Sequence, residues 1–113
     1  MIGSVCMTTI LVIMRHSPRD CPALSESARK VTLEAGSKLG ELTKKHGLKA
    51  VASWVSCYPP EHIAVSVYDA PTIEAFDNFL LEPVVAKYYA IQDKVEYKIA
   101  MTREEGLKLL QPS

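Results

Sequence analysis

The chain has 113 residues, of which 48% are hydrophobic, and its 13 basic and 13 acidic side chains give a formal net charge of zero. This length suits one small domain, and the apolar content is too high for a disordered chain. No basic stripe is present that would neutralise phosphates, so nucleic acid is not the expected main partner.

Residues 1–8 are expected to form an N-terminal extension, and residues 9–113 a single domain. The apolar start lacks a basic region and a clean cleavage site, and no apolar run reaches the ~18 residues of a membrane helix. We therefore expect neither a signal peptide nor a membrane span. The spacing of Cys6, Cys21 and Cys57 is not that of a disulfide framework, so a reducing cytoplasm is the expected location.

The first half of the domain predicts a strand, a helix and a second strand. Residues 9–15 (TILVIMR) are apolar on both alternating faces, as in a strand buried on both sides. Pro22 suits the first position of a helix, which would make Cys21 its N-cap. Apolar residues then recur at helical spacing until Gly47 marks the end of this helix. Residues 48–57 (LKAVASWVSC) predict the next strand.

The second half repeats the order strand, helix, strand. A turn-forming connector leads into a strand over residues 62–69 (HIAVSVYD), and Pro71 opens a helix that Pro83 breaks or restarts. The expected buried side of that helix consists of Ile73, Phe76, Phe79 and Leu80. Residues 95–101 (VEYKIAM) alternate as a half-exposed strand, and Thr102 begins a last helix with a capping box.

This order of elements predicts an α+β fold of the ferredoxin-like βαββαβ type. Right-handed crossovers then give a four-stranded antiparallel sheet of order 4-1-3-2, with helices on one face and an extra C-terminal helix. The first strand is apolar on both sides, so the other sheet face would present an apolar patch to water. A second copy packed sheet to sheet would cover this patch, and we therefore expect a homodimer.

Over roughly residues 9–102 the chain resembles the dimeric α+β barrel superfamily. The resemblance rests on the order of elements, on Arg15-His16 at the end of the first strand, on Trp54, and on the passage from residue 68 to 71 (YDAP). The chain looks most like small stand-alone members, some of which are similar to nickel-binding proteins. The superfamily also holds cofactor-free monooxygenases and lactone isomerases, so the resemblance implies a fold and a dimer rather than one activity.

The predicted topology gathers several polar residues at one edge of the sheet. His16 ends the first strand, Cys57 ends the second, His62 begins the third, and the loop with Cys21 lies beside them. We predict His16, His62 and Cys57 as metal ligands, with Cys21, Asp20 or Glu61 as further donors. Two imidazoles with a thiolate or a carboxylate suit zinc, nickel or copper. The alternative is that both histidines are ordinary polar residues at strand ends.

Cys21 is also a candidate catalytic nucleophile. Its thiolate at a helix N-terminus would be stabilised by the helix dipole and by Arg15 or Arg19, with His16 as the base. The alternative is a capping residue without chemistry.

Four aromatic residues are candidates for binding an organic ligand in a pocket between sheet and helices: Trp54, Tyr58, Tyr68 and Tyr97. Aromatic walls with a polar group suit a small planar molecule. The alternative is that these side chains belong to the core and the interface.

The leading functional hypothesis is a homodimeric protein that binds a small molecule or a transition metal at this edge, without a membrane partner. One alternative is a cofactor-independent monooxygenase or isomerase, and another is a structural interaction module without a ligand. The motifs GxSxG, HExxH and the P-loop are absent, which argues against α/β hydrolases, common zinc proteases and nucleotide hydrolases.

Overall fold

A computed structural model describes residues 7–56 and 62–112. The strands are β1 (Thr8–His16), β2 (Lys49–Ser56), β3 (His62–Ala70) and β4 (Lys94–Ala100). The helices are the short 3-10 helix η1 (Pro18–Asp20), α1 (Glu26–Lys45), α2 (Ile73–Leu80), α3 (Pro83–Ala90) and α4 (Arg103–Leu109).

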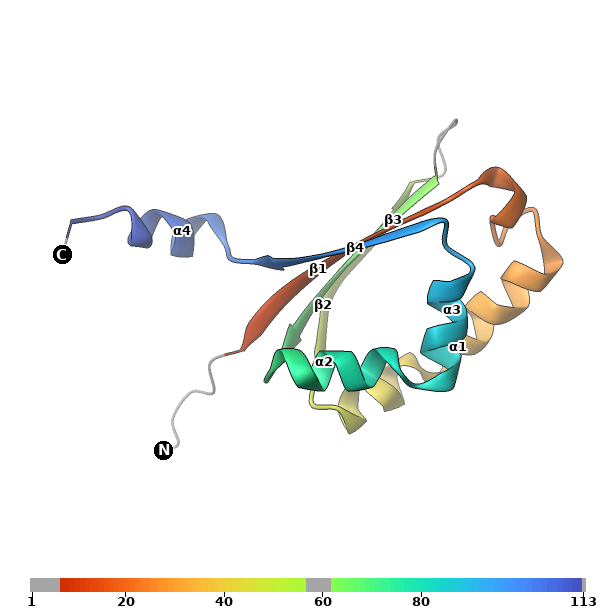
Figure 1. The fold of residues 1–113 in the computed structure, drawn as a ribbon, viewed down its shortest axis with the longest axis horizontal. Helices are drawn as coiled ribbons and strands as arrows, with labels where there is room; N and C mark the ends of the chain where they lie inside the picture. The colour runs from red at the N-terminus through yellow and green to blue at the C-terminus, as the bar shows by residue number, and fades with distance from the viewer. Residues whose placement is uncertain (1–6, 57–61, 113) are drawn as a thin grey trace.

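The four strands form one antiparallel sheet of order β2-β3-β1-β4, which confirms the predicted order 4-1-3-2. β1 lies between β3 and β4 and is antiparallel to both, and β2 pairs with the outer side of β3. Figure 1 shows α1, α2 and α3 together on one face of the sheet, as predicted for a ferredoxin-like fold. The opposite face carries no helix of the described chain, and we call it the open face.

The core lies between the helix-covered face of the sheet and the three helices. Val12 and Met14 of β1 are buried there, because alternate residues of a strand point to the same side. Phe76 and Phe79 of α2 pack against Tyr68 of β3, with ring centroids 5.8 and 5.5 Å from it. Phe79 is fully buried and holds α2 to the sheet.

The predicted start of the first helix was wrong. α1 begins at Glu26, and its N-cap is Ser25, whose Oγ accepts a hydrogen bond from the Ala28 backbone N–H at 3.2 Å. The Cys21 carbonyl accepts hydrogen bonds from the N–H groups of Leu24 and Ser25, so residues 21–25 form a turn before the helix. A serine hydroxyl is a far better cap than a thiol, which explains the later start.

The predicted break at Pro83 is confirmed, because α2 ends at Leu80 and α3 begins at Pro83. Ile73 was expected to be buried, yet it is 48% exposed. It is the first residue of α2 and lines a surface hollow between α2 and β4.

α4 begins with the predicted capping box of Thr102 and Glu105. Figure 1 shows this helix beyond the end of the sheet and away from the other helices. Leu107 and Leu109 on it, and Leu110 at its C-cap, are exposed. Among the described helices, none has the length and apolar character needed to cross a bilayer.

Candidate functional site

Three residues that carry chemistry meet at one end of the sheet: His16, Cys21 and His62. The register of β1 and β3 places His16 directly opposite His62, and such residues share a face of the sheet. Their ring centroids lie 5.3 Å apart, with the rings nearly perpendicular. One donor atom from each histidine and the Cys21 Sγ all lie within 4.8 Å of one another. The strand order thus brings the two histidines together as expected, and the turn before α1 adds the thiol.

The site lies on the helix-covered face of the sheet. His16 follows Val12 and Met14 among the alternate residues of β1 that point to this face. Cys21 and His62 are buried, at 3% and 7% exposure, and His16 is half-buried. In the described part of the chain Cys21 is a free thiol. Water therefore has little access to these side chains, and polar atoms here depend on partners from the protein or on a bound ion.

Two ring nitrogens in this site have no hydrogen-bond partner. They are Nε2 of His16 and Nδ1 of His62, and both are buried. An unsatisfied buried polar atom costs about 1–3 kcal/mol of folding free energy. A metal ion between these nitrogens and the thiol would satisfy both atoms at once, which makes this cluster the strongest candidate site in the described residues.

The turn between α3 and β4 supports the segment around His16. The Asp93 N–H donates to the Arg15 carbonyl at 2.7 Å, and the Ser17 N–H donates to Asp93 Oδ2 at 2.8 Å. Gln92 Oε1 lies 3.2 Å from Nδ1 of His16. No local pattern in the sequence indicates the role of Gln92, because it lies 76 positions from His16 along the chain.

The remaining predicted donors lie elsewhere or outside the described residues. Cys57 and Glu61 fall in the segment 57–61, which the structure does not describe. Asp20 Oδ2 accepts a hydrogen bond from Ser17 Oγ at 3.3 Å and is not part of the three-residue cluster. Arg15 lies on the open face, where it pairs with Glu96. Cys21 lies five residues before Glu26, the first residue of α1, so it is not at the N-terminus of that helix.

The third histidine occupies the opposite end of the fold and has a partner. His46 Nε2 lies 2.6 Å from Glu82 Oε2, and Lys45 Nζ lies 2.9 Å from the same oxygen. The hydrogen bond with His46, and then that with Lys45, lower the pKa of Glu82. This ion pair ties the end of α1 to the start of α3 and explains His46 without a ligand.

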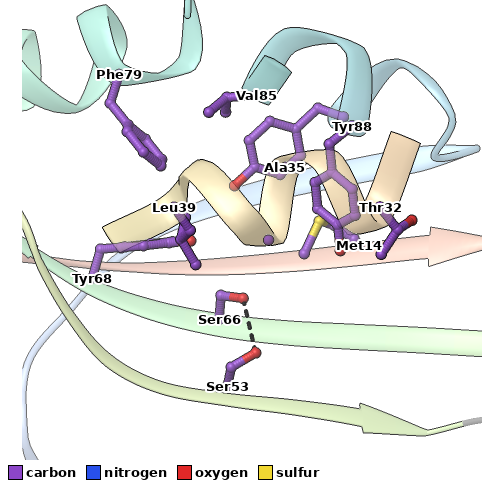
Figure 2. Close-up of a pocket in the computed structure, with 12 residues that line it drawn as sticks. Met14, Thr32, Ala35, Leu39, Ser53, Ser66, Tyr68, Phe79, Val85 and Tyr88 are labelled. Atoms are coloured by element: carbon purple, nitrogen blue, oxygen red, sulfur yellow. Dashed lines mark hydrogen bonds between the residues drawn. The ribbon is translucent and has the colours of Figure 1, made fainter. Parts of the chain in front are cut away.

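A cavity of about 150 Å³ lies between the sheet and helices α1 and α3 (Figure 2). Its walls are mainly apolar, with hydroxyl groups from Thr32, Ser53, Ser66 and tyrosines. Ser53 and Ser66 face each other across β2 and β3, with their oxygens 3.4 Å apart. The cavity is large enough for a small organic molecule and is the second candidate site.

Of the four aromatic residues expected in such a pocket, Tyr68 lines this cavity. Trp54 pairs with Val65 and lies on the open face, 62% exposed. Tyr97 borders the separate hollow between α2 and β4. Tyr58 lies outside the described residues.

Two further tyrosines from α3, which were not among the predicted residues, belong to the cavity. Tyr88 and Tyr89 both line it beside Tyr68. Burial raises the pKa of all three phenols. These hydroxyls stay protonated at neutral pH and can donate hydrogen bonds.

Comparison with known proteins supports the fold. Neither the protein-family models nor the curated proteins give a match. Among solved structures the chain is similar to the de novo designed protein Ferredog-Diesel, with a TM-score of 0.50 and 11% identity over 87% of this chain and 89% of that one. It is also similar to a dimeric ferredoxin-like protein from an uncultured marine organism, with a TM-score of 0.47 and 10% identity over 89% and 94% of the two chains. The first similarity and the strand order together assign a ferredoxin-like α+β fold.

Proposed function

We propose that this protein is a homodimer that binds a transition metal ion through His16, Cys21 and His62. The observation that carries the proposal is the pair of buried ring nitrogens without partners beside a buried free thiol. Metal coordination would satisfy both nitrogens and use the thiol as a thiolate, which removes the energetic cost of leaving them unpaired.

The donor set favours nickel, zinc or copper. Imidazole nitrogen and thiolate sulfur suit these metals, whereas calcium and magnesium prefer oxygen ligands. Zinc bonds to such donors are about 2.0–2.3 Å long, so donor atoms spread over up to 4.8 Å must move closer by roughly 1 Å on binding. Three protein ligands leave a further coordination position open to water or a small ligand.

The burial of Cys21 favours a ligand role over a nucleophile role. A nucleophile must reach its substrate, and Cys21 is only 3% exposed. The alternative is that Cys21 acts as a nucleophile with His16 as its general base. A reducing cytoplasm, which we propose as the location, would keep the thiol available for the metal.

Titration of tag-free, reduced protein with Co²⁺ tests the metal site. We expect a sulfur-to-cobalt charge-transfer band and a dissociation constant below about 1 μM. Cys21→Ser should abolish this band. His62→Gln should keep the band but weaken binding by more than the ~10–100-fold typical of an outer-shell change.

Cys6→Ser is the control and should bind Co²⁺ like the wild type. Cys57→Ser tests the predicted ligand that lies outside the described residues. Loss of the sulfur band in Cys57→Ser, with the band intact in Cys21→Ser, would overturn the assignment of Cys21. Absence of any binding tighter than about 1 μM would overturn the metal site altogether.

The occupant that we propose for the open face is a second copy of the chain. Apolar residues form its centre: Leu11, Ile13, Ala52, Trp54, Ile63, Val65 and Val67. Charged residues form its β4 edge, where Glu96 pairs with Arg15 and lies 3.9 and 4.0 Å from Lys94 and Lys98. An apolar centre with a charged rim is typical of protein interfaces, and a two-fold dimer matches such a face with itself.

The tyrosine-lined cavity supports a second candidate function. A cofactor-independent monooxygenase or isomerase would hold a small apolar molecule there, with Tyr68 as a hydrogen-bond donor. If neither the metal site nor the cavity binds a ligand, the remaining candidate is a structural interaction module.

A further inference from the structure

Gln92 contacts the candidate metal site from outside the ligand set. It lies two residues after the end of α3, and its backbone N–H donates to the Tyr89 carbonyl at 3.1 Å. Its side chain makes two contacts: Nε2 donates to the Tyr88 carbonyl at 3.3 Å, and Oε1 lies 3.2 Å from Nδ1 of His16. The side chain thus bridges the end of α3 and the His16 ring.

The Tyr88 carbonyl determines which way the Gln92 amide points. A backbone carbonyl can only accept a hydrogen bond, so the amide NH₂ must face Tyr88 and the amide oxygen must face His16. An amide oxygen can only accept in turn, so Nδ1 of the neutral His16 ring must carry the proton. The proton on Nδ1 leaves Nε2 with a lone pair, and this is the buried nitrogen without a partner.

We infer that Gln92 is a positioning residue that holds His16 in the tautomer needed for metal binding through Nε2. This inference rests on the proposed function. A ligating histidine usually donates its other ring N–H to an outer partner, which fixes the ring and its tautomer. Gln92 supplies that partner before any metal arrives, so the site needs no tautomer exchange on binding.

The same turn fixes the backbone on both sides of His16. Asp93 accepts from the Ser17 N–H and donates to the Arg15 carbonyl, so the residues before and after His16 are both held. With the ring held by Gln92, backbone and side chain are positioned together. The contact from Gln92 and the two contacts from Asp93 thus position the same candidate metal ligand, His16.

Nuclear magnetic resonance of the metal-free protein tests the tautomer directly. Long-range ¹H–¹⁵N spectra of the neutral rings distinguish a protonated Nδ1 from a protonated Nε2. We expect His16 to carry its proton on Nδ1 in the wild type and to lose this preference in Gln92→Met. A wild-type His16 protonated on Nε2 would overturn the inference whatever the protein binds.

Co²⁺ affinity of the same variants tests the consequence for the metal. Gln92→Met has a similar shape but no acceptor oxygen, and we expect about 10–100-fold weaker binding with the sulfur-to-cobalt band preserved. Gln92→Glu keeps an acceptor opposite Nδ1 and should restore wild-type affinity or exceed it. Gln111→Met, at an exposed position, is the matched control and should change nothing.

The two proposals fail in different ways. Equal Co²⁺ affinity of the wild type and Gln92→Met would overturn the positioning role while the metal site stands. A wild type that carries the Nδ1 proton but binds no Co²⁺ would overturn the proposed function, and with it the role of Gln92 in metal binding. Equally weak binding by Gln92→Glu and Gln92→Met would also count against the inference, because it would mean that the acceptor is irrelevant.

Discussion

At the scale of single residues, burial acts differently on two groups of polar side chains under the helices. His16 and His62 each keep one buried ring nitrogen without a partner. Burial instead raises the pKa of Tyr68 and Tyr89, so their environment favours the protonated phenol. The histidines therefore gain from a bound cation, whereas the buried tyrosines lose stability if they ionise.

The tyrosines predict a loss of stability at alkaline pH. In the unfolded chain their pKa is near 10.0, and burial raises it in the folded chain. Above about pH 10 the unfolded state releases protons that the folded state keeps, so the free energy of unfolding is highest below this pH and then falls. Urea unfolding at about pH 9 and about pH 11 measures this fall.

Tyr89→Phe should make the fall between these two pH values shallower, because burial, together with the neighbouring tyrosines, raises the pKa of Tyr89. Tyr97→Phe is the comparison. The pKa of Tyr97 is also raised by burial, but its side chain is 45% exposed, so we expect a smaller change. Equal slopes in the wild type and Tyr89→Phe would contradict this account.

At the scale of elements, α1 forms one wall of the cavity above the sheet, and Gly36 is part of that wall. A Cβ added at Gly36 would meet no heavy atom within 4 Å, and the same holds for Gly40 one turn further on. Gly36 lines the cavity and Gly40 does not. The two glycines therefore form a matched pair, one beside the cavity and one away from it on the same helix.

We expect Gly36→Leu to stabilise the protein more than Gly40→Leu. Both changes gain about 0.6–1 kcal/mol of helix propensity, but only the side chain at position 36 can fill apolar space in the cavity. Urea unfolding gives the difference. Gly36→Leu should also abolish chemical-shift changes caused by p-cresol, a probe of the second candidate function. A Gly36→Leu protein less stable than Gly40→Leu would show that the cavity has no room to fill.

At the scale of the whole molecule, the helices cover one face of the sheet and leave the other open. β1 has Leu11 and Ile13 on the open face, and β3 has Val65 and Val67 beside them. Single apolar residues are common on protein surfaces, but a contiguous apolar face usually marks an interface. A domain of 113 residues gains stability by burying such a face. We therefore expect the molecule in solution to have twice the 12.5 kDa mass of one chain.

Val65→Lys tests this assembly, because Val65 lies between Ile13 and Trp54 at the centre of the open face. In sedimentation the variant should be monomeric and folded, and the fluorescence of Trp54 should shift to longer wavelength as the ring meets water. Leu33→Lys is the control, since Leu33 is 67% exposed on α1, and it should stay dimeric. A monomeric wild type would rule out the dimer.

Much of the fold was predictable because its signals are local. Alternating apolar residues in β1, the glycine after α1 and the prolines that flank α2 all act within a few neighbours. The meeting of His16 and His62 followed from strand order, since neighbouring strand ends share an edge. The chemistry of the site was less predictable. Cys21 reaches it through a turn that ends at Ser25, not through the helix cap that the proline indicated.

The sequence by itself determined the strands, the helices and the edge where the histidines gather, because the period of apolar residues and the turn residues act over short distances. Only the tertiary structure decided which side chains share a face. One extra residue, Val51, bulges from β2 between Ala50 and Ala52, and this reverses the alternation and turns Trp54 to the open face. Likewise, packing of the α3–β4 turn against β1 sets Gln92 beside His16. Contacts between distant segments depend on how the helices pack on the sheet, and no short stretch of sequence predicts this packing.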